Sequence, residues 1–128
     1  MSNRNRPISP HLQIYKPQLT SILSITHRLT GMGLAFGSLA LVYFLVSLMN
    51  GPESYEVAKH FFRSWFGLAL LFGCVIGVSF HILNGIRHLF WDAGCGLDLK
   101  SVYASGWLTI IGTLLLTGLI SGIVLCQL

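Results

Sequence analysis

Charged side chains are scarce in this 128-residue chain, where Asp, Glu, Lys and Arg together occupy only 9% of the positions. About a quarter of the residues of a typical soluble domain are charged. The composition therefore excludes an ordinary soluble protein. Hydrophobic residues make up 53% of the chain, and this excess predicts an integral membrane protein.

Cysteine clusters and basic clusters are also lacking. The three cysteines, Cys74, Cys95 and Cys126, are widely separated, so neither a zinc site nor a disulfide framework is indicated. The net charge is +4, but the basic residues occur singly, and we expect no nucleic-acid partner. The first residues are polar and resemble neither a secretory signal nor a transit peptide.

Three long runs contain no Asp, Glu, Lys or Arg: residues 29–49, 64–86 and 101–128. Each reaches the roughly 20 residues that a helix needs to cross a membrane. The sequence therefore predicts an all-α, single-domain bundle of three transmembrane helices, over about 24–49, 62–90 and 102–127. Residues 1–20 are predicted to form an N-terminal tail, because prolines interrupt them.

Capping residues suggest where the helices begin and end. The first helix is expected to start at Thr20 or Ser21, either of which can cap it, and to stop at the Asn-Gly-Pro sequence of residues 50–52. Ser54 is a candidate cap for a short turn of helix at the membrane interface before the second span.

The distribution of lysine and arginine predicts the orientation. The N-terminal tail and the connection between the second and third spans share one side, which carries Arg4, Arg6, Lys16, Arg28, Arg87 and Lys100. The other side carries only Lys59 and Arg63. Loops on the cytoplasmic side of a membrane protein carry an excess of lysine and arginine. The N-terminus is therefore expected on the cytoplasmic or matrix side, and the C-terminus on the opposite side.

One face of the second span combines ionisable residues with glycine. At 100° per residue, a narrow stripe contains Gly73, Gly77, His81, Gly85, His88 and Asp92. Because glycine has no side chain, the stripe forms a groove on both sides of the His81 imidazole. Such a groove can accept a flat, bulky group. The alternative is close helix packing on the glycines, with His81 bonded to a neighbouring helix.

His81 is the candidate haem ligand, because an ionisable residue within a span is costly and imidazole commonly ligates haem iron. His88 lies seven residues further on, about 10.5 Å along the axis. It therefore cannot reach the opposite side of the same iron. His27 is expected to lie too close to the membrane surface to reach that depth easily. The opposite ligand is expected from another chain.

Polar residues of the first span form a second group. Ser24 and Arg28 lie one turn apart, so both can donate hydrogen bonds to a carbonyl oxygen at the membrane boundary. His27, Arg28 and His88 are candidate donors to anionic haem propionates. The alternative is that Arg28 and Arg87 merely mark the ends of spans, and for Arg87 the two interpretations have equal weight.

Two motifs carry a family resemblance. Residues 24–31 read Ser-x-x-His-Arg-x-Thr-Gly, and residues 81–92 read His-x-x-x-Gly-x-Arg-His-x-x-x-Asp. Together with Arg6-Pro7, their order and spacing resemble the large membrane-anchor subunit of succinate dehydrogenase, a cytochrome b. Residues 10–15 are similar to the tail of its mitochondrial-type branch.

The resemblance implies a respiratory complex II in a bacterial inner membrane, or in the mitochondrial inner membrane of a eukaryote. A flavoprotein subunit would oxidise succinate, and an iron–sulfur subunit would pass electrons to ubiquinone. This chain and a second small anchor subunit would hold haem b between them. The chain would not be catalytic alone.

The resemblance also assigns roles to individual residues. His81 would be the axial haem ligand, with His27, Arg28 and His88 near the propionates. Ser24 and Arg28 would bind the quinone, and Asp92 would contribute to proton delivery. Two alternatives remain: a fumarate reductase anchor working in the quinol-oxidising direction, and a membrane scaffold without a cofactor.

Overall fold

Four helices make up the fold in the computed structural model, which describes residues 16–126. They are α1 (Leu19–Met49), α2 (Pro52–Arg63), α3 (Trp65–Asp92) and α4 (Leu99–Cys126). Three of them, over Leu19–Met49, Trp65–Asp92 and Leu99–Val124, are long and apolar enough to cross a membrane. The prediction of an all-α fold with three membrane-spanning helices is confirmed.

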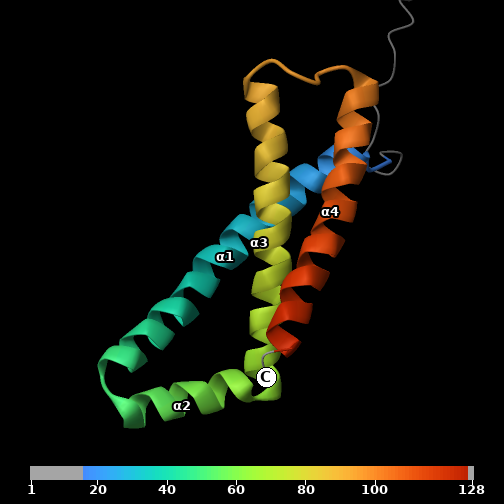
Figure 1. The fold of residues 1–128 in the computed structure, drawn as a ribbon. Helices are drawn as coiled ribbons and strands as arrows, with labels where there is room; N and C mark the ends of the chain where they lie inside the picture. The colour runs from blue at the N-terminus through green and yellow to red at the C-terminus, as the bar shows by residue number, and fades with distance from the viewer. Residues whose placement is uncertain (1–15, 127–128) are drawn as a thin grey trace, which may run out of the picture.

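The three long helices are not parallel. Figure 1 shows α3 and α4 running side by side, while α1 crosses behind α3 and diverges from it toward α2. The first turns of α1 also contact α4: a Cβ added at Gly106 would lie 3.0 Å from Leu19 and 3.1 Å from Leu23. The helix α2 then closes the open end between α1 and α3 (Figure 1).

Two predictions about helix starts were wrong. The N-cap of α1 is Gln18, which makes no side-chain capping bond, so Thr20 and Ser21 lie inside the helix. The connection after α1 is a 12-residue helix rather than a turn, and its N-cap is Gly51 rather than Ser54. Gly51 has φ 101°, which glycine adopts without steric strain. Pro52 then supplies a favourable first helical residue.

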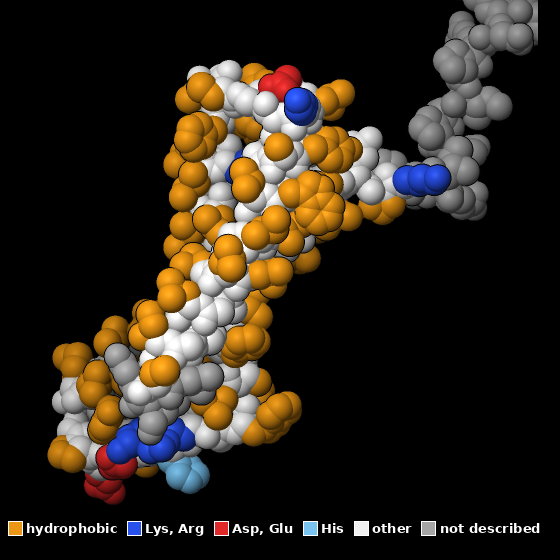
Figure 2. Space-filling view, turned by 45° about the vertical axis from the view of Figure 1, so that its right-hand side comes forward, with side chains coloured by type: hydrophobic (Ala, Val, Ile, Leu, Met, Phe, Trp, Pro, Cys, Tyr) orange, Lys and Arg blue, Asp and Glu red, His pale blue; other side chains and the backbone are white. Residues whose placement is uncertain are grey.

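Hydrophobic side chains lie outside and polar ones lie between the helices. Figure 2 shows apolar side chains over most of the visible surface, with charged ones mainly toward its ends. The buried hydrophobic residues among those described are Leu23, Ala58 and Phe80, whereas buried polar residues include Ser79, Asn84, Arg87, Thr109, Thr113 and Thr117. This distribution suits a protein surrounded by lipid, where polar groups pair between helices.

Candidate functional site at the crossing of α1 and α3

The crossing of α1 and α3 brings His27 onto His81. Their ring centroids are 3.9 Å apart and the rings are nearly parallel, at 6°. The helices approach closely here because Gly31 has no side chain: an added Cβ would lie 3.1 Å from Cε1 of His81. The close approach of the two helices therefore requires glycine at position 31, where it packs against the His81 ring.

The expectation that His27 lies too close to the membrane surface to reach His81 was wrong. It assumed that positions on two spans can be compared by counting residues from the membrane boundary. Because α1 crosses α3 obliquely (Figure 1), that count does not give the relative depth. The two rings nevertheless face one another, whereas axial ligands must each aim a nitrogen at the iron from about 2 Å.

Thr30 forms a hydrogen bond with His81, in which Oγ1 of Thr30 lies 3.2 Å from Nδ1 of His81. The single hydroxyl hydrogen of Thr30 has nearer acceptors, since the carbonyl oxygens of Thr26 and His27 are both 2.9 Å away. The threonine oxygen therefore accepts the Nδ1–H of His81. In that tautomer Nε2 carries the free lone pair, as a metal-binding imidazole requires.

His88 completes a group of three histidines around His27. The ring centroids of His27 and His88 are 5.2 Å apart and tilted by 48°, and His88 meets Trp91 edge-on at 5.2 Å. Nδ1 of His27 is buried and makes no hydrogen bond among the described residues. A buried ring nitrogen without a partner suits an additional polar group at this position.

The glycine stripe of α3 is partly packed and partly open. A Cβ at Gly77 would lie 3.4 Å from Leu34, and one at Gly85 would lie 3.8 Å from His27. At Gly73 it would meet nothing within 4 Å. A cavity of about 320 Å³ lies here between α1 and α3, with Thr30 in its lining. Close helix packing on glycine is therefore confirmed at Gly77 and Gly85, and the expectation that the stripe accepts a flat, bulky group stays a prediction.

Ser24, Arg28 and Asp92 make no recorded contact with the three histidines. Ser24 is half-buried, while Arg28 and Asp92 are exposed. Within the described part of the chain, none of the three side chains makes a hydrogen bond or an ion pair. No other described residue therefore engages the hydroxyl of Ser24 or the guanidinium of Arg28.

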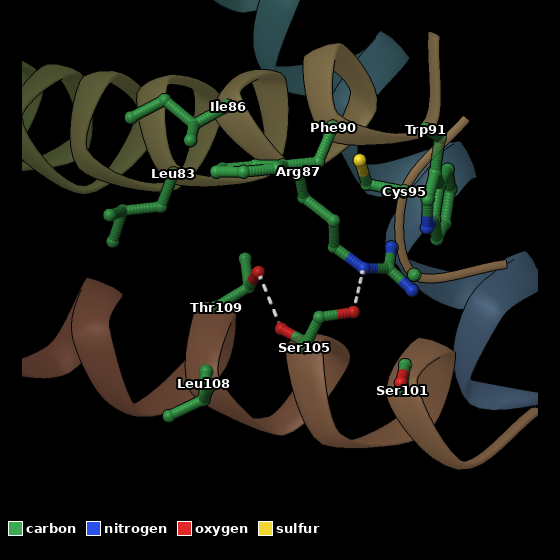
Figure 3. A pocket seen from close by; sticks show the side chains of 11 residues that line it. Leu83, Ile86, Arg87, Phe90, Trp91, Cys95, Ser101, Ser105, Leu108 and Thr109 are labelled. Atoms are coloured by element: carbon green, nitrogen blue, oxygen red, sulfur yellow. Dashed lines mark hydrogen bonds between the residues drawn. The ribbon is translucent and has the colours of Figure 1, made fainter. Parts of the chain in front are cut away.

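Arg87 is buried between α3 and α4, a position that its sequence neighbours do not indicate. Only 5% of it is exposed, so the interpretation of Arg87 as a mere marker of a span end was wrong. It faces α4, where Nε donates to Oγ of Ser105 at 3.0 Å (Figure 3). Nη2 donates to the carbonyl of Val102 at 3.0 Å. On its own helix, Nη1 donates to Oδ1 of Asn84 at 3.4 Å.

Thr30 was the other omission. It occupies the threonine position of the first motif, so its place in the motif was visible, but its partner lies 51 residues away. The contacts of Thr30 with His81 and of Arg87 with Ser105 each join two helices. Neither follows from spacing along one helix, because the sequence does not give the relative rotation of two helices.

Comparison with known proteins identifies relatives over nearly the whole length. The family model of the succinate dehydrogenase/fumarate reductase transmembrane subunit matches residues 2–120. A succinate dehydrogenase cytochrome b556 subunit of Paracoccus denitrificans is 39% identical over 112 residues, covering 88% of this chain and 86% of that protein. The subunit of the same name from Rickettsia conorii is 40% identical over 119 residues, covering 90% of each.

A plant relative is similar as well. The succinate dehydrogenase cytochrome b560 subunit of Marchantia polymorpha is 42% identical over 107 residues, covering 80% of this chain and 78% of that protein.

Proposed function

Because the chain belongs to the succinate dehydrogenase/fumarate reductase transmembrane subunit family, we propose that it is the haem b-binding anchor of a succinate:ubiquinone oxidoreductase. Its relatives are named as cytochrome b subunits of succinate dehydrogenase, which supports a membrane-anchor cytochrome subunit of complex II. The observation that carries the haem proposal is the bond between Thr30 and Nδ1 of His81, because it leaves Nε2 able to bind iron.

The residues at the α1–α3 crossing fit a haem. His81 would supply a neutral imidazole nitrogen to the iron, and Thr30 would fix its tautomer and ring orientation. His27, with its unpaired Nδ1, His88 and the free Arg28 provide donors for the two propionates. The haem itself supplies a one-electron redox centre. The other iron ligand would come from the second small anchor subunit, because His27 stacks face to face on His81 in this chain.

Ser24 and Arg28 form this chain's share of the quinone site. Ser24 donates to a quinone carbonyl at the membrane boundary, and Arg28 stabilises the oxygen as it gains negative charge. Both side chains lack partners among the described residues, which supports a role for them as donors to a bound quinone. Asp92, exposed at the end of α3, contributes to proton delivery.

The remaining parts of the complex act through this anchor. A flavoprotein subunit oxidises succinate, and an iron–sulfur subunit docks at the membrane and delivers electrons to ubiquinone. The lysine and arginine bias supports placing these subunits on the side of the N-terminus, in the cytoplasm or the matrix. The membrane is accordingly the bacterial inner membrane, or the mitochondrial inner membrane if the source is a eukaryote.

The absorption spectrum of the purified complex tests the proposed function. A low-spin haem b with two imidazole ligands gives sharp bands in the reduced state, and we expect these bands at one haem per complex. A complex that assembles and oxidises succinate without any haem bands would contradict the proposal and favour a scaffold. Rapid quinol-driven fumarate reduction, with slow succinate oxidation, would instead favour a fumarate reductase anchor.

Replacement of Thr30 tests the role of its hydroxyl group. Thr30→Val keeps the shape of the side chain but removes the acceptor for His81 Nδ1–H, so the imidazole becomes a poorer electron donor to iron. We expect roughly ten- to hundredfold weaker haem retention and a higher midpoint potential in a redox titration. Thr30→Ser should behave like the parent, because it retains the oxygen. A Thr30→Val complex with unchanged potential and retention would exclude this role.

A further inference from the structure

A second cavity lies between α3 and α4, on the other side of α3 from the histidines. Its volume is about 340 Å³. Figure 3 shows Leu83, Ile86 and Phe90 of α3 along one wall and Leu108 of α4 opposite, with Arg87 reaching between the two helices. The cavity therefore combines apolar walls with a single cationic group.

The charge of Arg87 has no carboxylate partner within the described residues. The only ion pair found among them joins Lys59 and Glu56. Asp98, in the loop beside the cavity, accepts the backbone N–H of Ser101 at 3.0 Å instead. A guanidinium that is only 5% exposed is costly to leave uncompensated. The site therefore favours an anion supplied from outside the chain.

The guanidinium also keeps unused donors. It has five N–H groups, and its hydrogen bonds to Ser105, Val102 and Asn84 use three of them. One N–H on each terminal nitrogen is left over. Two donors on neighbouring nitrogens match two oxygens of a phosphate.

The position of Arg87 indicates where that phosphate comes from. Arg87 lies five residues before the end of α3, about 7.5 Å along the helix. Its guanidinium stacks on Trp91 at 4.0 Å, and tryptophan is typical of the membrane interface. At this depth the anion beside an apolar wall is a lipid headgroup, and basic pockets between transmembrane helices are known to bind lipid phosphates.

We propose that the cavity between α3 and α4 binds one glycerophospholipid, with its phosphate on Arg87 and an acyl chain along Leu83, Ile86 and Leu108. The lipid bridges the two helices at the end where the 93–98 loop joins them. Trp91 contacts both Arg87 and His88, so the lipid lies one side chain away from the histidine group.

Binding of defined lipids to the delipidated complex tests this proposal. Phosphatidylglycerol should raise the melting temperature of the parent complex, whereas the diacylglycerol with the same acyl chains and inorganic phosphate should not. Arg87→Gln should weaken phosphatidylglycerol binding roughly tenfold or more, as expected for a lost charged hydrogen bond. Arg63→Gln is the matched control, because Arg63 is exposed on α2, and it should bind like the parent.

A second variant separates lipid binding from folding, because Arg87 also bonds to α4. Leu108→Trp places a larger side chain in the apolar wall and so narrows the cavity. Leu108 is 68% exposed, so the larger side chain can be accommodated, and the bonds of Arg87 stay in place. It should likewise lose the phosphatidylglycerol effect. Equal binding by the parent and Leu108→Trp would overturn the proposal. An equal rise in melting temperature with inorganic phosphate or diacylglycerol alone would also overturn it. The same holds if phosphatidylglycerol has no effect because a partner protein fills the cavity.

Discussion

Replacement of His81 with leucine is expected to abolish the reduced haem b bands of the purified complex. The change removes the nitrogen that we propose binds the iron, together with the Nδ1 atom that pairs with Oγ1 of Thr30 at 3.2 Å. Loss of one of two axial ligands leaves iron without a low-spin environment. The measurement is the dithionite-reduced minus oxidised difference spectrum, normalised to the amount of complex.

Two variants control this experiment. His60→Leu alters an exposed histidine of α2 that is remote from the crossing, and it should leave the bands intact. His88→Leu should retain a low-spin spectrum, since His88 contacts His27 and Trp91 at the edge of the group. If His88→Leu abolished the bands while His81→Leu kept them, the assigned ligand would be the wrong histidine.

Expression of the chain without its partners tests the origin of the second ligand. The chain alone should not give a low-spin spectrum with two imidazole ligands, because the stacked rings of His27 and His81 cannot bind opposite faces of one iron without separating. A complete low-spin spectrum from the isolated chain would contradict a ligand from the other anchor subunit.

Ser24→Ala and Arg28→Leu are each expected to impair ubiquinone reduction by the assembled complex roughly ten- to hundredfold. The estimate follows from losing one hydrogen bond to a charged acceptor, about 1.5–3 kcal/mol. The quinone ring enters the hydrocarbon region, and its carbonyl oxygen needs donors at the boundary. Ser24 and Arg28 offer such donors one turn apart. The measurement compares succinate-driven ubiquinone reduction between variants.

Matched substitutions on the same chain provide the controls. Ser38→Ala removes an exposed hydroxyl of α1 that bonds only to the carbonyl of Ala35, and Arg63→Leu removes an exposed charge of α2. Both should keep normal quinone reduction. Succinate oxidation with a soluble acceptor should persist in every variant, because that reaction precedes the membrane step.

Two outcomes would count against the quinone assignment. Equal loss of soluble-acceptor and ubiquinone activity in Arg28→Leu would indicate defective assembly, as expected if the proposed contact of Arg28 with a haem propionate stabilises the complex. Normal ubiquinone turnover in both variants would place the quinone site elsewhere.

The sequence by itself determined the membrane fold and the family. Uncharged runs of about 20 residues predict helices in lipid, because a helix of that length crosses the membrane and satisfies its backbone polar groups within the segment. The two motifs are local, and their spacing survives in the folded chain as turns of α1 and α3. Helix periodicity also placed His81 and the glycines on one face correctly, since this relation exists within a single helix.

Only the tertiary structure decided which faces meet and at what depth. The oblique crossing of α1 brings His27 and Thr30 to His81, and the rotation of α4 places Ser105 beside Arg87. Periodicity gives directions around one axis but neither the crossing angle nor the rotation of a neighbouring helix. Those quantities depend on which small residues allow contact, such as Gly31 against His81, and such packing involves residues far apart in the chain.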